Sequence, residues 1–514
     1  MFSKVKSCAV HGVDGRMIDV EADVNDGLPV FTMVGYLSSS VRESSERVRT
    51  ALKNSGFHLP PKRITINLSP ADMRKDGSGY DLAIATAVLL SLGVTAELPM
   101  EQTLVLGELS LDGSIKAIPG VLPMVICARE EGMTSCIVPK ENVQEAALVQ
   151  GISVIGVSSL KETMEYIQGI KEYENTNVEQ PAVDTSEYLY DIDFSDVVGQ
   201  ESIKRGMEIA AAGFHNVLLT GAAGAGKSML AKRLPTILPQ MSFEESLEVT
   251  KIYSVGGMLP PEGGLIHRRP FLAPHHTISE YALIGGGRVP TPGEVSFAHY
   301  GVLFLDELPE FSKPVLEVLR QPLEDRRIRI SRVQASYEFP ADFMFVAAMN
   351  PCPCGNYPDY RRCSCTEQQI RRYQSKVSGP LLDRIDIRME VKGVKQEVLF
   401  SKQKTESSKT IRARVEQARQ MQKERFAGTG LLFNSQLDGK NLEEYITLSE
   451  EGKRLVLQLF EEQELSVRGV HRVLKLARTI ADLAGSEEIE HAHLQEAAFY
   501  RNQDVFAKGV LYGN

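Results

Sequence analysis

The sequence predicts an α/β protein in which a parallel β-sheet with helices on both faces follows a second α/β unit and precedes a helical segment. Three observations lead to this prediction. Residues 194–393 alternate short apolar strands with helices, a pattern typical of a parallel sheet covered on both sides. Strand-like runs also occur in residues 1–170. From residue 394 onward, helical patterns dominate.

Length and composition favour a multidomain globular protein. The 514 residues exceed one ordinary domain, and about 150 residues per domain would give about three. A net charge of -10 argues against a surface coated with nucleic-acid-binding charge, although a local basic track is compatible with it. The apolar run 82–94 is shorter than the about 20 residues that a bilayer requires, and the N-terminus lacks a signal-peptide pattern. We therefore expect a cytoplasmic protein without a membrane partner.

Residues 1–170 form the first predicted domain. Its expected elements are strands at 63–67, 103–107 and 136–138 and helices at 40–55, 80–92 and 121–131. The polar, acidic segment 171–193 has little apolar periodicity, so we interpret it as a linker. A surface loop within one larger domain is the alternative.

The motif at residues 221–228 predicts a triphosphate-binding loop. It matches G-x-x-x-x-G-K-[ST] in full and lies between an expected strand, 216–220, and an expected helix that starts near Met229. Glycines allow backbone N–H groups to approach phosphates, and Lys227 is expected to reach the β- and γ-phosphates of ATP. Ser228 is expected to ligate Mg²⁺. The predicted nucleotide-binding residues of this loop are Gly221, Ala222, Ala223, Gly224, Ala225, Gly226, Lys227 and Ser228.

A second apolar strand, 302–305, ends in the carboxylates Asp306 and Glu307. Ligands of parallel sheets bind beyond the carboxyl ends of the strands, so both should lie near the phosphate loop. Asp306 is expected to hold Mg²⁺ together with Ser228, and Glu307 to accept a proton from the attacking water. An exposed acidic turn is the alternative.

Three further residues are candidates for catalysis. Asn350 follows the expected strand 343–349 and would orient the hydrolytic water, the role called sensor 1; a turn before a proline is the alternative. Arg384, at an expected helix end, would serve as an arginine finger for a neighbouring subunit. Arg468 opens a later helix and would act as sensor 2. A finger acting in trans implies a ring, which we expect to be a homohexamer, although either arginine could instead form a surface salt bridge.

The segment around residues 324–332 alternates arginine with isoleucine. As a strand it places Arg327 and Arg329 on one face and the isoleucines on the other, with Arg332 near its end. Arginines there could contact DNA phosphates without reading sequence. A solvated edge strand, whose charges prevent aggregation, is the alternative.

Four of the seven cysteines are close together in the sequence: Cys352, Cys354, Cys363 and Cys365. Four thiolates on loops suit a tetrahedral structural Zn²⁺ site, although the C-x-C spacing is less diagnostic than C-x-x-C. Four free thiols are the alternative. Such a site would cross-link the loop that follows Asn350.

Several longer segments resemble one family. They are FLAPHHTIS at 271–279, LIGGG at 283–287, PGEVSFAH at 292–299, LFLDELPEF at 303–311 and ARTIADL at 477–483. The chain resembles the ComM/YifB-type magnesium chelatase-like AAA+ proteins of bacteria. The resemblance implies an AAA+ ATPase core at 194–393 and a C-terminal helical lid at 394–514, the magnesium chelatase-like C-terminal domain. Lid helices are expected at 408–425, 449–464, 468–484 and 491–501.

The family resemblance also implies a function. We expect an ATP- and Mg²⁺-dependent hexameric helicase that acts on branched or single-stranded DNA. It would promote branch migration in recombination or natural transformation. A metal-chelatase motor subunit and an ATP-dependent protease or unfoldase are the alternatives.

The first domain is similar to the C-terminal domain of Lon proteases, which has a ribosomal S5 domain 2-like fold. The segments KDG at 75–77 and GELSLDG at 107–113 carry this likeness. Lon proteases use a serine–lysine pair, but here Gly79 occupies the serine position and the lysine position falls near Leu122. A neighbouring serine, Ser78, has no lysine in the matching segment, and a serine without a base is not activated. We therefore expect a non-proteolytic domain that binds DNA or assists assembly.

Overall fold

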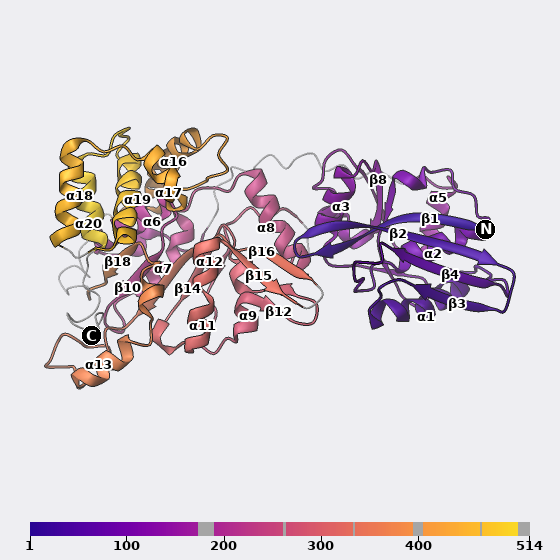
Figure 1. The fold of residues 1–514 in the computed structure, drawn as a ribbon, viewed down its shortest axis with the longest axis horizontal. Helices are drawn as coiled ribbons and strands as arrows, with labels where there is room; N and C mark the ends of the chain where they lie inside the picture. The colour runs from indigo at the N-terminus through magenta and orange to yellow at the C-terminus, as the bar shows by residue number, and fades with distance from the viewer. Residues whose placement is uncertain (173–189, 261–263, 333–334, 394–404, 463–464, 502–514) are drawn as a thin grey trace.

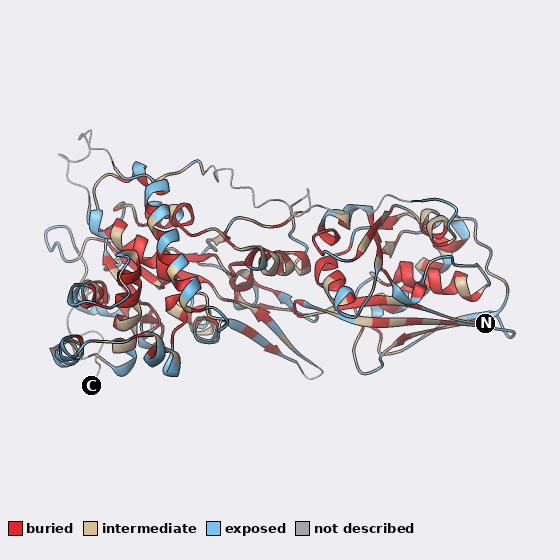
Figure 2. Cartoon of the chain, turned by 90° about the horizontal axis from the view of Figure 1, so that it is seen from above, coloured by how far each residue is buried: buried red, intermediate tan, exposed pale blue. Residues whose placement is uncertain are grey.

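The computed structural model describes residues 1–172, 190–260, 264–332, 335–393, 405–462 and 465–501. Two separate β-sheets organise it, one of seven strands and one of five. Buried residues concentrate around these two sheets and their helices (Figure 2). The chain therefore has two α/β bodies, with a helical layer on the second (Figure 1).

The first sheet has the order β3-β4-β2-β1-β5-β8-β9. Its strands are β1 Phe2–His11, β2 Asp14–Asn25, β3 Val30–Val34, β4 Arg63–Ser69, β5 Thr103–Val105, β8 Ser135–Pro139 and β9 Ser153–Val157. β1 and β2 form a long antiparallel hairpin, and the pairs from β5 to β9 are parallel. The small ribbon β6 Glu108–Leu109 with β7 Ile115–Lys116 lies beside the sheet.

The helices of this first body are α1 Ser39–Asn54, α2 Asp81–Ser91, α3 Val121–Glu130, α4 Val143–Ala146 and α5 Leu160–Ile167. Helix α1 begins where the Ser38 hydroxyl accepts the Val41 amide, a standard N-cap. Helix α2 is buried along almost its whole length against β1 and β2, which accounts for its nearly uniform apolar sequence. The three strands and three helices expected here are confirmed, with bounds that differ by one or two residues.

The second sheet is parallel and has the order β11-β14-β17-β10-β18. Its strands are β10 Val217–Thr220, β11 Phe271–Leu272, β14 Val302–Leu305, β17 Met344–Met349 and β18 Ile387–Glu390. Every residue of β10, β14 and β17 is buried, which is the mark of a parallel strand covered on both faces. The central strands β17 and β10 lie side by side.

Helices and two hairpins complete this body. The helices are α6 Glu201–Gly213, α7 Lys227–Arg233, α8 Phe243–Val255, α9 Glu280–Ile284, α10 Glu294–Phe297, α11 Lys313–Val318, α12 Arg320–Asp325, α13 Glu367–Gln374 and α14 Gly379–Leu382. The hairpins are β12 Gly285–Gly286 with β13 Thr291–Pro292, and β15 Arg327–Ser331 with β16 Ser336–Pro340. The second hairpin leads directly into β17.

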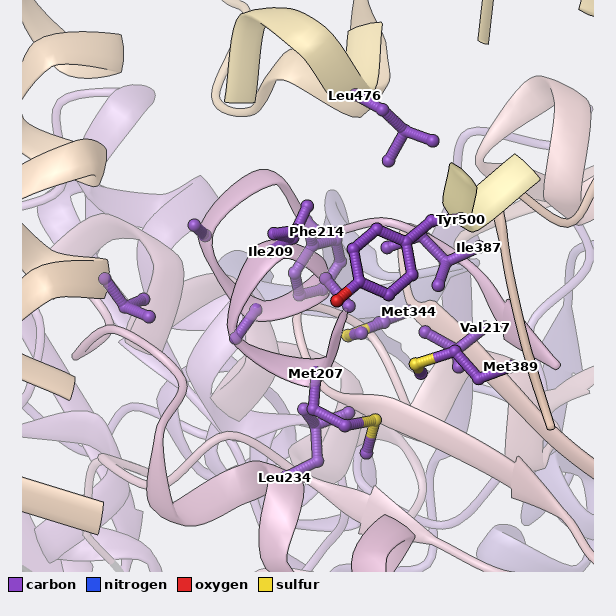
Figure 3. Packing of buried hydrophobic residues seen from close by; sticks show 14 of the residues in the cluster. Met207, Ile209, Phe214, Val217, Leu234, Met344, Ile387, Met389, Leu476 and Tyr500 are labelled. Atoms are coloured by element: carbon purple, nitrogen blue, oxygen red, sulfur yellow. The ribbon is translucent and has the colours of Figure 1, made fainter. Parts of the chain in front are cut away.

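In its described residues, the C-terminal layer has the helices α16 Ser408–Arg425, α17 Gly439–Tyr445, α18 Glu450–Glu462, α19 Val467–Leu483 and α20 His491–Arg501. The four helices expected here are confirmed. Figure 3 shows Leu476 of α19 and Tyr500 of α20 in one apolar cluster with Ile387 and Met389 of β18. A buried ion pair, Arg472 with Asp386 at 2.6 Å, fastens α19 to the start of β18.

Asp193, the last residue of the expected linker 171–193, makes contacts outside that segment. Its carboxylate accepts the Ser195 and Ser408 amides, and so joins the start of the second α/β body to the start of α16. Residues 173–189 of that linker, and 394–404 and 502–514 of the expected lid, lie outside the described residues. In the parts of the chain that the structure describes, no helix is both long enough and apolar enough to span a membrane.

The two α/β bodies contact each other through α3 and α8. The Gly120 amide donates to the Ser254 carbonyl at 3.0 Å, and the Ser254 hydroxyl donates to the buried carboxyl group of Glu145. Burial raises the pKa of Glu145. Lys251 adds an ion pair with Asp14 at 3.2 Å. The first domain is thus joined to the second α/β body by main-chain, side-chain and charged contacts.

Candidate active site

The phosphate loop connects β10 to α7. Strand β10 ends at Thr220, and α7 begins at Lys227. Gly224 and Gly226 have φ angles of 76° and 96°, in the left-handed region that residues with a side chain rarely adopt. The motif therefore forms the tight turn that its glycines predicted.

Lys227 lies at the centre of the site. Its Nζ donates to the carbonyls of Gly221 at 2.7 Å and Ala222 at 2.9 Å, and to Asn350 Oδ1 at 3.0 Å. Burial lowers the pKa of Lys227, and the carboxylates of Asp306 and Glu307 oppose that shift. A phosphate group in the loop would attract the ammonium group more strongly than neutral oxygens do.

The two residues predicted to hold Mg²⁺ are in contact. Ser228 Oγ donates to Asp306 Oδ2 at 2.5 Å. A hydroxyl and a carboxylate at this separation are the hard oxygen ligands that Mg²⁺ prefers, and such sites retain several waters besides. The donor set therefore fits Mg²⁺ next to the phosphate loop.

Glu307 is exposed and has an unusual backbone conformation. Its φ of 52° is left-handed, and its amide donates to Asp306 Oδ1 at 2.9 Å. A non-glycine residue in this region costs on the order of 1 kcal/mol or more, and such strain gathers at functional sites. The Glu307 carboxylate is near enough to Lys227 to oppose the lowering of that lysine's pKa.

Sheet order explains why these residues meet. Strand β17 lies between β14 and β10, and all three are parallel. Their carboxyl ends therefore carry Asp306 with Glu307, Asn350, and the phosphate loop side by side. The hydrogen bond from Lys227 to Asn350 places Asn350 at the phosphate loop, and its sensor 1 role stays a prediction.

Arg384 and Arg468 lie elsewhere, at the opposite edge of this sheet. They line one pocket with Asn216, Phe343 and Asp386, which are at the amino ends of β10, β17 and β18. A strand of four residues spans roughly 13 Å, so this edge is far from the chain's own phosphate loop.

Arg384 is well anchored in that pocket. Its guanidinium donates to the Pro380 carbonyl at 2.7 Å and pairs with Glu324, and 10% of its side chain is exposed. Arg384 and Arg468 both lower the pKa of Glu324, with Arg384 the stronger influence. The roles of arginine finger for Arg384 and sensor 2 for Arg468 stay predictions.

The four clustered cysteines meet at one point. The Sγ atoms of Cys352, Cys354 and Cys363 are 3.4 to 3.7 Å apart, and Cys365 completes a group within 4.8 Å. Four sulfurs around zinc at about 2.3 Å would be about 3.8 Å apart, whereas a disulfide needs about 2.05 Å. The arrangement fits a tetrahedral cation better than bonded pairs.

This cysteine loop is packed against the phosphate loop. It begins directly after Asn350, and a Cβ placed on Gly355 would be 3.4 Å from the Ala223 amide nitrogen and 3.9 Å from Asn350 Cγ. The side-chain amide of Gln374, on α13 beyond the loop, donates to the carbonyl of Pro351, the first residue of the loop, at 2.8 Å. Sequence spacing indicated the cluster but not this contact with the nucleotide site.

The arginine hairpin β15–β16 has the predicted faces. Ile328 and Ile330 are buried, whereas Arg327 and Arg329 are exposed. Both arginines pair with Glu338 of β16, at 2.8 and 3.1 Å, so part of their charge is neutralised within the hairpin. Sequence reasoning missed this partner, although Glu338 faces Arg329 in the strand register.

The first domain contains no serine–lysine pair at the Lon position. Ser78 donates to Glu108, and Leu122 is fully buried. Lys75 is buried and donates to the carbonyls of Met73 and Pro70. A Cβ on Gly79 would be 3.0 Å from Ile118, so even a serine there would be crowded.

Comparison with known proteins places the chain in a family. Three family models match it: "Magnesium chelatase, subunit ChlI" over residues 193–399, "Subunit ChlI of Mg-chelatase" over 20–142 and "Magnesium chelatase, subunit ChlI C-terminal" over 405–501. The protein YifB of Escherichia coli K12 is 40% identical over 98% of this chain and 97% of its own length. The competence protein ComM of Haemophilus influenzae is 40% identical over 97% of each chain. The chain belongs to the ComM/YifB-type family.

The ComM/YifB-type family consists of magnesium chelatase-like AAA+ proteins, which implies ATP and Mg²⁺ as ligands of the site described above. Part of the chain is also similar to Lon proteases. Lon protease 2 of Bacillus subtilis is 30% identical over 183 residues, 32% of this chain and 32% of that protein. The expected fold class, with an AAA+ core and a Lon-like part, is confirmed.

Proposed function

We propose that this ComM/YifB-type protein is a DNA motor, a hexameric helicase that promotes branch migration during recombination or natural transformation. One observation supports it above the others. Strand β17 carries Asn350 at its nucleotide end and receives the exposed arginine hairpin at its other end. A change at the phosphates thus has a direct route through one strand to a basic surface. The competence protein ComM is a close relative.

The residues present can perform ATP hydrolysis. Lys227 binds the β- and γ-phosphates, and Asn350 and Glu307 orient the attacking water. The water oxygen bonds to the γ-phosphorus as the bond to the ADP oxygen breaks, and Glu307 accepts the water proton. Mg²⁺, when held by Ser228 and Asp306, offsets the phosphate charge.

Translocation follows if the arginine hairpin contacts DNA. Arg327, Arg329 and Arg332 lie on an exposed hairpin, where they can bind phosphates of any sequence. DNA competes with Glu338 for the first two, so contacts form and release at modest cost. Such exchange suits a motor that must move along a strand.

The alternatives have less support. A protease role lacks the serine–lysine pair of Lon proteases, since Gly79 stands at the serine position and Leu122 near the lysine position in the described first domain. A metal-chelatase motor would work with separate subunits, and the first domain would have no evident task there. Absence of peptide cleavage, measured with a fluorogenic peptide and ATP, would exclude the protease role.

The test of the proposed function is displacement of a synthetic four-way DNA junction. Wild-type protein with ATP and Mg²⁺ is expected to resolve the junction into two forked duplexes, and protein with ADP is not. Active ATP hydrolysis without binding to any DNA would reject the proposal. Native mass spectrometry in parallel reports the number of subunits, which we expect to be six.

Arg384→Ala is expected to lower ATP turnover by at least about 100-fold, since an arginine finger contributes about 10³ or more to kcat. Because Arg384 lies away from the chain's own phosphate loop, we expect ATP turnover to be restored in rings that mix two different inactive variants. Subunits with Lys227→Ala keep Arg384, so mixing the two inactive proteins should restore turnover at their shared interfaces. Arg49→Ala, an exposed arginine on α1, is the control. No recovery in rings shown to be mixed would contradict the trans role.

We also propose that the cysteine cluster holds structural Zn²⁺. Protein purified without chelator is expected to contain about one zinc per chain by elemental analysis. Cys363→Ser with Cys365→Ser should lose it and lower ATPase activity, because the loop contacts Ala223 and Asn350. Cys127→Ser, on α3 and outside the cluster, is the control. If the double substitution left the zinc content unchanged, the proposal that these cysteines bind zinc would be rejected.

A further inference from the structure

The two domains also meet at the tip of the β1–β2 hairpin, next to the arginine hairpin (Figure 1). The His11 ring stacks on Tyr337 of β16 with 4.5 Å between centroids, and its Nε2 lies 3.2 Å from the Ser336 carbonyl oxygen. Gly12, the next residue, lies so close to β16 that a Cβ on it would be 2.8 Å from the Glu338 carbonyl oxygen. The first domain therefore rests against the hairpin that carries the candidate DNA residues.

A third element reaches the same place. Arg332, at the tip of the arginine hairpin, donates to the Gly287 carbonyl at 3.2 Å in the turn between β12 and β13. The first domain, the β12–β13 hairpin and the arginine hairpin together line one pocket of about 260 Å³. The pocket residues that carry the argument are Arg16, Arg74, Arg288, Arg332, Tyr36 and Tyr337.

Positive charge in this pocket is less neutralised than on the hairpin itself. Four arginines and two aspartates line it, and one of the arginines, Arg74, pairs with Asp76 at 3.2 Å. Within the described residues, no carboxylate pairs with Arg16, Arg288 or Arg332. Three guanidinium groups thus line the pocket with no ion pair to a described carboxylate, in a chain whose net charge is -10.

The pocket also offers aromatic rings. Tyr36 comes from the first domain and Tyr337 from β16, and neither is fully buried. Ring faces beside a basic track are the combination by which proteins bind single-stranded nucleic acid: bases stack on the rings, and guanidinium groups contact the phosphates. Arginines that form no ion pair with a carboxylate could bind any anion. The two tyrosines beside them favour a nucleotide chain as the ligand.

We propose that this pocket, built jointly by the first domain and the two hairpins, binds single-stranded DNA. Arg16, Arg288 and Arg332 contact phosphates, and Tyr36 and Tyr337 stack on bases. The inference rests on the proposed DNA-motor function and gives the first domain a task in it. A strand that leaves the arginine hairpin is received by a surface on the same chain.

The test measures binding of fluorescent oligothymidine to the full-length protein by anisotropy, over a series of salt concentrations. Arg16→Ala with Arg288→Ala is expected to weaken binding at least about 10-fold. It should also lower the slope of log affinity against log salt by about 1.4, since each single-strand phosphate contact contributes about 0.7. Arg49→Ala, from α1 of the same domain, should match wild type.

A second experiment tests the role of the tyrosines, and a single variant guards against misfolding of the double variant. Single-stranded DNA containing 5-iododeoxyuridine, cross-linked by light to wild-type protein, is expected to label Tyr36 or Tyr337. The single variant Arg288→Gln, on an exposed turn, should lower the salt slope by about 0.7 even if the double variant does not fold.

The outcomes separate the two proposals. Wild-type protein that binds neither the four-way junction nor single-stranded DNA would reject the DNA-motor function and this pocket together, whereas protein that binds the junction but no single-stranded DNA would overturn the pocket alone. Normal wild-type binding, with an unchanged salt slope in the arginine variants and cross-links outside the pocket, would overturn the pocket alone and leave the motor function standing.

Discussion

Lys227→Ala is expected to abolish ATP turnover and junction displacement. The ammonium group of Lys227 already approaches three oxygen acceptors of the phosphate loop and Asn350, at 2.7 to 3.0 Å. Removing a hydrogen bond to a charged group costs about 1.5–3 kcal/mol, so nucleotide affinity should fall roughly 10- to 150-fold. Turnover should fall further, because the same group contacts the γ-phosphate as it transfers.

Titration with a fluorescent ATP analogue and phosphate release, measured side by side, check this prediction. Lys232→Ala is the matched control, since Lys232 is an exposed residue on the last turn of the same helix, α7. Phosphate release by Lys227→Ala within a few-fold of wild type would show that the loop is not the site of hydrolysis.

Glu307→Gln is expected to retain ATP binding and to slow hydrolysis by about 10²- to 10⁴-fold, the usual contribution of a general base. The amide has the shape of the carboxylate but cannot take the proton of the attacking water. Because the side-chain length is unchanged, the left-handed backbone at φ 52° and the bond from the Glu307 amide to Asp306 should persist.

Single-turnover hydrolysis and equilibrium binding of ATP separate the two effects. Glu310→Gln is the control, because Glu310 is an exposed carboxylate nearby that forms an ion pair with Lys376 at 3.5 Å. Rapid turnover by Glu307→Gln would assign the base to another group. Lost nucleotide binding would instead indicate that Glu307 holds the loop in place.

The parts of this protein that could be predicted from sequence depend on local rules. The glycine spacing of residues 221–228 specifies a turn, and buried apolar runs specify parallel strands. Parallel strands bring their carboxyl ends to one edge, which is why Asp306, Glu307 and Asn350 could be placed near Lys227 in advance. Alternation in β15 likewise predicted which face its arginines occupy.

Several features could not be predicted because they join residues distant in sequence. Glu338 neutralises Arg327 and Arg329 only because two strands pair in one register. The shared pocket of Arg384 and Arg468 exists because α19 packs beside the start of β18, and no periodicity in either segment encodes that contact.

Local chemistry in the chain thus specifies the triphosphate loop, the acidic strand end and the cysteine cluster, since each depends on neighbours a few residues apart. Long-range packing sets which charges stay available. It pairs some arginines with carboxylates and places two at the far end of the sheet strands. At the junction of the domains it leaves Arg16 and Arg288 without an acidic partner among the residues that the structure describes. The reason is physical: a guanidinium acts through what lies within a few ångströms of it, and only folding fixes those neighbours.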